Sequence, residues 1–88
     1  MNVPNLDCME PDELMALWVQ YRAHPVTVAR ELGISGKGAK RTVMDLSNYA
    51  SNKATAIRCR LAGKISEALM YEGIADRIYK GLPDSVKW

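Results

Sequence analysis

The stretch YASNKATAIRCRLAGKISEALMYEGIADRIYKGLP, residues 49–83, decides the fold that this sequence predicts. Its apolar residues recur at spacings of three, four and seven, which is the period of one side of an α-helix and not of a strand. The pattern is interrupted at Gly63-Lys64, where a glycine can adopt the left-handed backbone that ends a helix. A connection this short makes the two helices antiparallel neighbours. The stretch therefore predicts a helical hairpin.

The two helices of the hairpin are expected at about 39–62 and 65–81. The apolar side of the first comprises Val43, Leu46, Ala50, Ala54, Ile57 and Leu61, and that of the second comprises Ala68, Tyr71, Ala75, Ile78, Tyr79 and Leu82. Small side chains at four of these positions would let the helix axes approach closely, namely Ala50, Ala54, Ala68 and Ala75. Pro83 ends the second helix, because the residue before a proline is kept out of the helical region.

Two shorter helices are expected upstream, at 11–23 and 25–32. Proline suits the first position of each, because the N–H that it lacks would have no helical partner there. His24-Pro25 separates the two helices, and Gly33 ends the second with Ile34 as its hydrophobic cap. The buried side of helix 11–23 comprises Leu14, Leu17, Trp18 and Tyr21.

Length and composition indicate one globular domain. Eighty-eight residues suffice for one core and are too few for two, and 48% hydrophobic with 25% charged residues is close to the globular average. Residues 1–8 are expected to be an irregular lead-in that docks Val3 or Leu6 on the core, and residues 33–38 a glycine-rich loop that can act as a hinge. The sequence predicts an all-α fold for residues 1–88, a small bundle of about four helices in which helices 11–23 and 25–32 brace the hairpin.

Two resemblances accompany this pattern. The hairpin resembles one tetratricopeptide repeat over residues 49–83, in its turn at Gly63, its packing positions at Ile65, Ala68, Tyr71 and Ala75, and its end at Leu82-Pro83. Its first helix departs from that repeat at Asn52, Thr55-Ala56 and Cys59. The run Tyr49-Ala50-x-Asn52-Lys53-x-Thr55-Ala56, with Tyr71-Glu72 and Asp76-Arg77-x-Tyr79, is similar to a group of uncharacterised short proteins from bacteriophage and environmental sequences. Neither resemblance implies an activity.

The sequence offers few residues for a metal, a cofactor or catalysis. His24 is the only histidine, and Cys8 and Cys59 form no CxxC pair, so neither a metal site nor a cofactor is expected. We expect two free thiols, with one disulfide between them as the alternative. Glu72 and Asp76 form a carboxylate pair, but the inner side of helix 39–62 supplies no further Glu or His to complete a metal site. We therefore expect no catalytic residue, no small-molecule substrate and no enzyme.

The sequence also carries no membrane or export signal. No run approaches 18 consecutive apolar residues, and residues 1–5 lack the basic and apolar regions of a signal peptide. We expect no membrane association and a cytoplasmic location.

Charge is distributed unevenly along the chain. The formal net charge is +2, yet residues 1–36 contain five acidic and two basic residues, and residues 37–64 contain seven basic residues against Asp45 alone. Such asymmetry is typical of a chain with an anionic partner. The candidate nucleic-acid contacts are Lys37, Lys40, Arg41, Lys53, Arg60 and Lys64. The alternative, which we favour for Lys53, Arg60 and Lys64, is neutralisation across the hairpin by Glu72 and Asp76.

The region 26–34 also resembles the first helix and turn of a helix-turn-helix motif, with the next helix as the reader. The amino-terminal end of that next helix carries Lys37, Lys40 and Arg41, which suit phosphate contact. However, Gly36-Lys37-Gly38 makes the turn longer than usual, and no cluster of Asn, Gln or Arg follows to read bases. A small DNA-binding regulator that uses the basic segment 37–64 is therefore the alternative function.

The leading interpretation is a non-enzymatic binding or assembly module whose partner is a second copy of the chain or another protein. It depends on the breadth of apolar and aromatic surface on helix 65–81, which exceeds what one partner helix can cover. The candidate assembly surface comprises Trp18, Met70, Ile74 and Tyr79.

Overall fold

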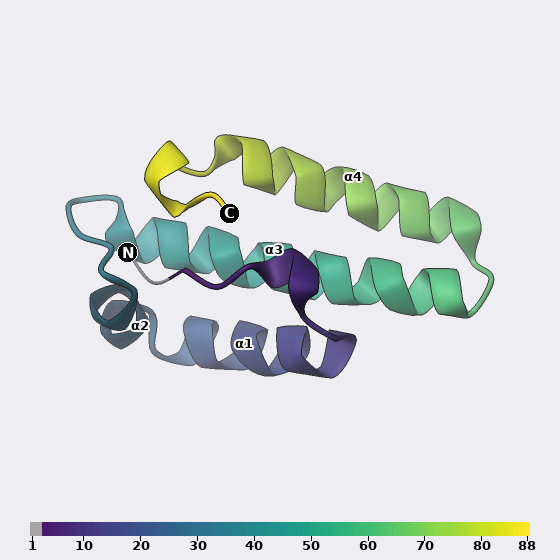
Figure 1. The fold of residues 1–88 in the computed structure, drawn as a ribbon, viewed down its shortest axis with the longest axis horizontal. Helices are drawn as coiled ribbons and strands as arrows, with labels where there is room; N and C mark the ends of the chain where they lie inside the picture. The colour runs from purple at the N-terminus through teal and green to yellow at the C-terminus, as the bar shows by residue number, and fades with distance from the viewer. Residues whose placement is uncertain (1–2) are drawn as a thin grey trace.

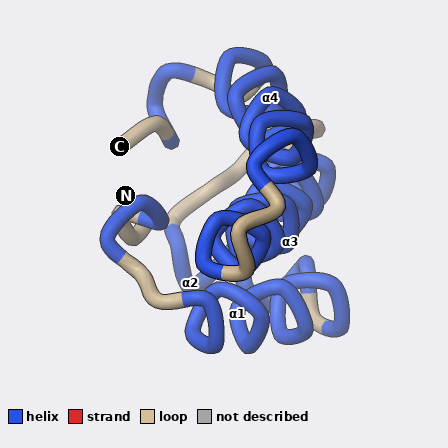
Figure 2. The backbone as a smooth tube through the Cα atoms, turned by 90° about the vertical axis from the view of Figure 1, so that its right-hand side faces the viewer, coloured by secondary structure: helices blue, strands red, loops and turns tan. Residues whose placement is uncertain are grey.

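Helix α3 (Ala39–Leu61) runs through the centre of the fold, with α4 (Ile65–Gly81) on one side and α1 (Pro11–Ala23) on the other (Figure 1). The computed structural model describes residues 3–88. The remaining elements are the short helix α2 (Pro25–Leu32) and two 3-10 turns, η1 (Leu6–Cys8) and η2 (Asp84–Val86). Seen along the helices, α4, α3 and α1 form three successive layers (Figure 2). No strand occurs in the described residues, so the predicted all-α bundle of four helices is confirmed.

The helix boundaries follow the local signals in the sequence. At the start of α1 the side chain of Glu10 accepts from the backbone N–H of Glu13, and the side chain of Glu13 accepts from the backbone N–H of Glu10 (2.9 Å). Gly33 (φ 74°) ends α2, and the N–H of Ile34 donates to the carbonyl of Ala29 (2.8 Å). These contacts are those of a left-handed helix cap with its hydrophobic residue behind it.

The hairpin turn uses the same device. Gly63 has φ 78°, and the N–H of Lys64 donates to the carbonyl of Cys59 (2.8 Å). The chain reverses here, and α4 packs antiparallel against α3 (Figure 1). The predicted hairpin is confirmed, with α3 ending at Leu61 and not at 62.

The core forms around α3, which is buried on two sides. Leu6, Leu14, Val43 and Leu46 are fully buried, and Ala50, Ala54, Ala68 and Ala75 are all at most 1% exposed. Ala56 is also buried, although it lies about 160° around the helix from Ala54 at 100° per residue. The single apolar side predicted for α3 was therefore incomplete, because α4 and α1 cover different sides of this helix.

Three expectations about buried residues need correction. Leu61 is one of the most exposed side chains, because α1 does not extend far enough to cover the last turn of α3. Trp18 is only half-buried at the edge of the core, with Arg22 over its ring at 5.8 Å. Residues 1–2 of the predicted irregular lead-in 1–8 lie outside the described residues. Residues 3–8 are not wholly irregular, since they contain η1, which docks Leu6 fully in the core, while Val3 packs against the core more loosely.

The carboxyl-terminal segment folds back over the hairpin, which the sequence patterns did not predict. Leu82 and Val86 are buried, and Trp88 lies edge-on to Tyr49 and Tyr79 at centroid distances of 4.9 and 4.8 Å. This segment comes close to the lead-in of the chain (Figure 2).

Candidate functional site

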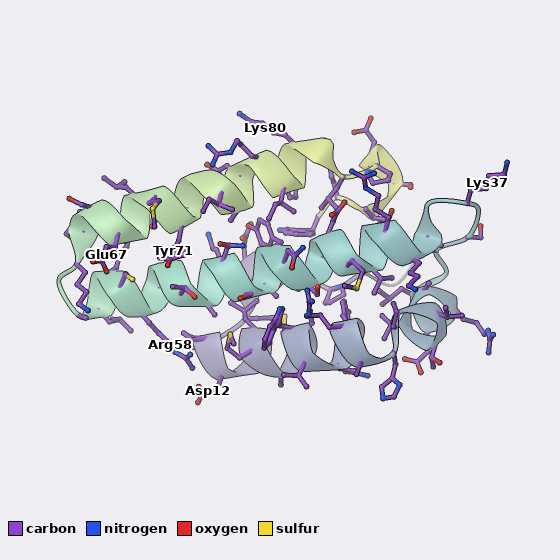
Figure 3. All side chains as sticks on the ribbon, turned by 180° about the vertical axis from the view of Figure 1, so that it is seen from behind. Asp12, Lys37, Arg58, Glu67, Tyr71 and Lys80 are labelled. Carbon is purple, nitrogen blue, oxygen red and sulfur yellow. The ribbon has the colours of Figure 1, made fainter. Side chains whose placement is uncertain are left out.

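The structure divides the basic segment 37–64 into a neutralised part and an unpaired part. Arg60 makes a bidentate pair with Glu72, and its Nη2 donates to Glu72 Oε1 at 2.8 Å. Arg58 Nη2 lies 2.7 Å from Asp12 Oδ1, and Figure 3 shows the two side chains reaching toward each other between α3 and α1. Hydrogen bonding to Arg60 lowers the pKa of Glu72, and the same contact raises the pKa of Arg60.

The favoured neutralisation across the hairpin therefore holds for Arg60 and Glu72 but not for the other residues named. Lys53 pairs with Asp7 in the lead-in, at 3.6 Å, and not with Asp76. Asp76 and Lys64 form no ion pair within residues 3–88. The carboxylates that sequence reasoning missed, Asp7 and Asp12, come from elements far away in the sequence.

Lys37, Lys40 and Arg41 are exposed and likewise form no ion pair with any described residue. They lie at the amino-terminal end of α3, where Lys37 projects from the loop (Figure 3). Lys64 lies at the opposite end of the hairpin. The six candidate nucleic-acid contacts are therefore not one face, and only three of them form a local unpaired group.

Two residues of this unpaired group, Lys37 and Lys40, line an open pocket of about 540 Å³ between α2 and the start of α3. Three cationic side chains line it, from the last turn of α2, the connecting loop and the first turn of α3: Arg30, Lys37 and Lys40. The other lining residues are small or apolar: Val26, Ala29, Gly33, Ile34, Ser35, Gly36 and Ala39. We call this feature the cationic pocket. Sequence reasoning gave its Lys37 and Lys40 but missed Arg30, because only the fold brings α2 beside the start of α3.

The other end of the molecule is apolar. Four large hydrophobic side chains are about half or more exposed within one short stretch around the hairpin turn: Leu61 (81%), Ile65 (48%), Leu69 (57%) and Met70 (53%). We call these four residues the apolar tip. The hairpin projects beyond α1 at this end (Figure 1), so no other element covers it.

The structure places the four residues of the predicted assembly surface in different surroundings. Met70 is exposed and belongs to the apolar tip, and Ile74 is half-buried on α4. Tyr79 instead faces the aromatic cluster of Tyr49 and Trp88, and its hydroxyl donates to the backbone carbonyl of Trp88. Trp18 packs against the core at the other side of α3. Periodicity did not identify Leu61 on α3, or Ile65 and Leu69 on α4, as exposed residues, because exposure depends on which other elements cover this end of the hairpin.

One polar cluster links parts of the chain that are distant in the sequence. Asp7 accepts hydrogen bonds from the Tyr49 hydroxyl (2.6 Å) and the Trp88 indole (2.9 Å). Partial burial acts to raise the pKa of Asp7, but these hydrogen bonds and the charge of Lys53 outweigh it and lower the pKa. Burial is the main cause that raises the pKa of Tyr49, and the hydrogen bond to Asp7 is the second. The contacts of this cluster join the lead-in to α3 and to Trp88.

Groups for metal or thiol chemistry are scattered. Cys8 and Cys59 are free, with Cys8 exposed and Cys59 half-buried. Within residues 3–88, no three His, Cys, Asp or Glu side chains gather closely enough to hold a metal ion. None of the helices in the described part of the chain has the length and apolar character needed to span a bilayer.

Comparisons of the chain with protein-family models, with curated proteins and with solved structures find no match. The resemblances to tetratricopeptide repeats and to short bacteriophage proteins therefore stay predictions.

Proposed function

We propose that this protein is a non-enzymatic assembly module that associates with a second copy of itself through the apolar tip. The observation that carries the proposal is the gathering of Leu61, Ile65, Leu69 and Met70 at one end of the molecule. Of the six large hydrophobic side chains that are strongly exposed in the described residues, these four lie within ten consecutive positions. Clustered apolar exposure is typical of an interaction surface, whereas scattered exposure is ordinary.

The difference in length between α3 and α1 explains why the apolar tip is exposed. At 1.5 Å per residue, α3 is about 35 Å long and α1 about 20 Å. Asp12, in the first turn of α1, already meets Arg58, so the final turn of α3 extends past α1. Leu61 lies almost directly in line with Val43 and Ala54, whose side of α3 is buried. The apolar side of α3 thus continues beyond its internal partner.

The charges around the apolar tip favour a second copy as the partner. Lys64 and Glu67 are both exposed, carry opposite signs and form no ion pair within the described chain. In a two-fold symmetric contact each surface faces itself, so Lys64 of one copy can face Glu67 of the other. Four apolar side chains per copy make a small interface, which is typical of weak association that depends on concentration. We propose the cytoplasm as the compartment, because both thiols are free.

Sedimentation equilibrium from low-micromolar to submillimolar concentration tests this proposal. We expect reversible dimerisation, with a dissociation constant that Leu61→Gln with Leu69→Gln raises by about tenfold or more, because exposed apolar area is lost from both copies. The matched control is Val19→Gln with Val26→Gln, which changes two side chains of similar exposure outside the tip (57% and 60%). A wild-type chain that stays monomeric throughout would refute the proposal, as would equal weakening by the control.

A charge reversal tests the orientation of the two copies. Lys64→Glu alone should weaken the dimer, because two like charges then face each other. Adding Glu67→Lys should restore the affinity, since the opposite signs meet again. If the double variant is as weak as Lys64→Glu alone, the two-fold arrangement is wrong even though the tip associates.

A second candidate function is nucleic-acid binding at the opposite end. It is supported by Lys37, Lys40 and Arg41, which lie together and pair with no carboxylate of residues 3–88, while Lys53, Arg58 and Arg60 are neutralised internally. Duplex binding should weaken steeply with salt, and Lys40→Ala with Arg41→Ala should reduce both the affinity and the salt slope. No binding to duplex at low salt would eliminate this function.

A further inference from the structure

We propose that the cationic pocket binds the phosphate group of a nucleotide, with the rest of the nucleotide lying on the pocket's apolar wall. This inference goes beyond assembly and does not depend on it. The pocket lies at the amino-terminal end of α3 and the apolar tip at the carboxyl-terminal end, about 35 Å away along the helix.

The cationic lining of the pocket favours an anion as its ligand. Arg30, Lys37 and Lys40 line one pocket from three different elements, and no Asp or Glu lines it. None of the three forms an ion pair with a described residue, although carboxylates neutralise Lys53, Arg58 and Arg60 elsewhere in the molecule. Three positive charges that line one concave surface repel one another and make the electrostatic potential there more positive, which favours the binding of an anion. A bound anion would relieve this repulsion.

The donor groups favour phosphate among anions. Arginine presents a planar fork that matches two phosphate oxygens, and lysines add compact charges that reach the remaining oxygens. The backbone N–H groups of Lys40 and Arg41 have no acceptor within residues 3–88, and they point out of the start of α3. These N–H groups can support the same oxygens, although the three side chains supply most of the attraction.

The size of the pocket and its apolar wall favour a nucleotide over inorganic phosphate. A volume of about 540 Å³ lies within the range of about 300–1,000 Å³ that is typical of small-molecule sites. Ala29 and Ile34 are buried behind the wall, and Val26 stands beside them with most of its surface exposed. Inorganic phosphate would leave this apolar wall uncovered, whereas the flat base or sugar of a nucleotide would cover it.

The loop keeps this space open. Gly36 has φ 93°, which only glycine adopts without strain, and a Cβ added at Gly36 or Gly38 would meet no atom within 4 Å. The loop therefore requires glycine at position 36 because of its backbone conformation, and not because a neighbouring side chain occupies the space of a Cβ. A ligand can approach it without moving any other part of the fold.

Amide chemical-shift titration of the full chain tests the proposal. The probes are adenosine monophosphate, inorganic phosphate, adenosine and a short single-stranded oligonucleotide. We expect saturable shifts at residues 33–41 with adenosine monophosphate, weaker binding of inorganic phosphate at the same amides, and much weaker binding of adenosine. Lys37→Gln with Lys40→Gln should lower the affinity for adenosine monophosphate by about tenfold or more, as expected from losing charge-assisted hydrogen bonds.

The matched control is Arg77→Gln with Lys80→Gln, which removes the same charge from two exposed positions on α4 that do not line the pocket. It should leave the affinity unchanged. Val26→Gln should weaken adenosine monophosphate but not inorganic phosphate, because it changes only the apolar wall. The Lys37→Gln with Lys40→Gln variant should sediment like the wild type, so this test and the dimer test can fail separately.

Two results would overturn the proposal. One is the absence of saturable shifts at residues 33–41 with any phosphate-bearing probe at low salt. The other is equal weakening by the pocket variant and the α4 control, which would indicate general charge attraction only. Tighter binding of the oligonucleotide at the same amides would support the phosphate site and identify a nucleic-acid strand as its source, whereas tighter adenosine monophosphate would identify a free nucleotide.

Discussion

Asp7 is the residue on which the most long-range polar contacts converge. Its carboxylate accepts from Tyr49 on α3 and from Trp88, and it lies 3.6 Å from Lys53. A single carboxylate thus ties the lead-in to the central helix and to the carboxyl-terminal segment. Its partners lie 42 and 81 positions away, so no local pattern could identify this role. The residue remains partly exposed, which limits how much each contact stabilises the fold.

Asp7→Asn should lower the free energy of unfolding at neutral pH by about 1–2 kcal/mol, because two charge-assisted hydrogen bonds become neutral ones. The pKa of Asp7 is lowered in the folded state, so the unfolded chain takes up its proton first as the pH falls. The contribution is therefore complete above the ordinary pKa of 3.8 and is lost as the pH falls below it. Urea unfolding at a series of pH values should show a shallower acid decline in Asp7→Asn. The control Asp84→Asn removes a more exposed carboxylate, and a decline as shallow as that of Asp7→Asn in this control would contradict the assignment.

At the scale of elements, glycine conformation decides where the hairpin turns. Gly63 has φ 78° and ends α3, whereas Gly81 ends α4 without a left-handed backbone. A Cβ added at either position would meet no atom within 4 Å. The two glycines therefore differ in backbone conformation and not in available space, which makes them a matched pair.

Gly63→Ala should lower the free energy of unfolding by about 1–2 kcal/mol, because alanine must then adopt the left-handed conformation. Gly81→Ala should be neutral or slightly stabilising, since alanine is favoured over glycine in a helix by up to about 1 kcal/mol. Chemical denaturation followed by circular dichroism measures both. Equal destabilisation by the two substitutions would mean that backbone conformation at Gly63 is not the determinant of the turn.

At the scale of the whole molecule, the two ends of the described chain are held together over the hairpin. Trp88 lies edge-on to Tyr49 and Tyr79, and its indole donates to Asp7. The contacts join the lead-in, α3, α4 and the segment after η2 into one cluster. This cluster lies at a distance from the apolar tip. The molecule therefore has one region in which the terminal segments are held by side-chain contacts and one end with exposed apolar side chains.

Trp88→Ala should lower the free energy of unfolding by about 1–3 kcal/mol, because it removes two edge-to-face aromatic pairs and one hydrogen bond. Trp88→Phe should retain much of the aromatic contribution and lose the bond to Asp7. A double-mutant cycle with Asp7→Asn then measures the coupling between the two residues. We expect Asp7→Asn to cost less in the Trp88→Phe background, and full additivity would show that the indole bond contributes nothing.

The sequence by itself determined the helices and the order in which they connect. Each boundary rests on contacts within a few residues, such as Pro11 at the start of α1, Pro25 at the start of α2 and Gly63 at the turn. Periodicity also identified most of the core, including Leu14, Val43 and the four predicted alanines. These features depend on backbone conformation and on the hydrophobic effect over one helix turn, and the residues involved are close in the sequence.

Only the tertiary structure decided which side chains remain free. Arg60 is neutralised by Glu72, whereas Lys37 and Lys40 meet no carboxylate in the described part of the chain and line a pocket together with Arg30. Leu61 has the same periodicity as the buried residues of α3, yet it is exposed because α1 is shorter than α3. The physical reason is that charge pairing and burial depend on distances between elements. Those distances are set by the packing of whole helices, which no local pattern of residues contains.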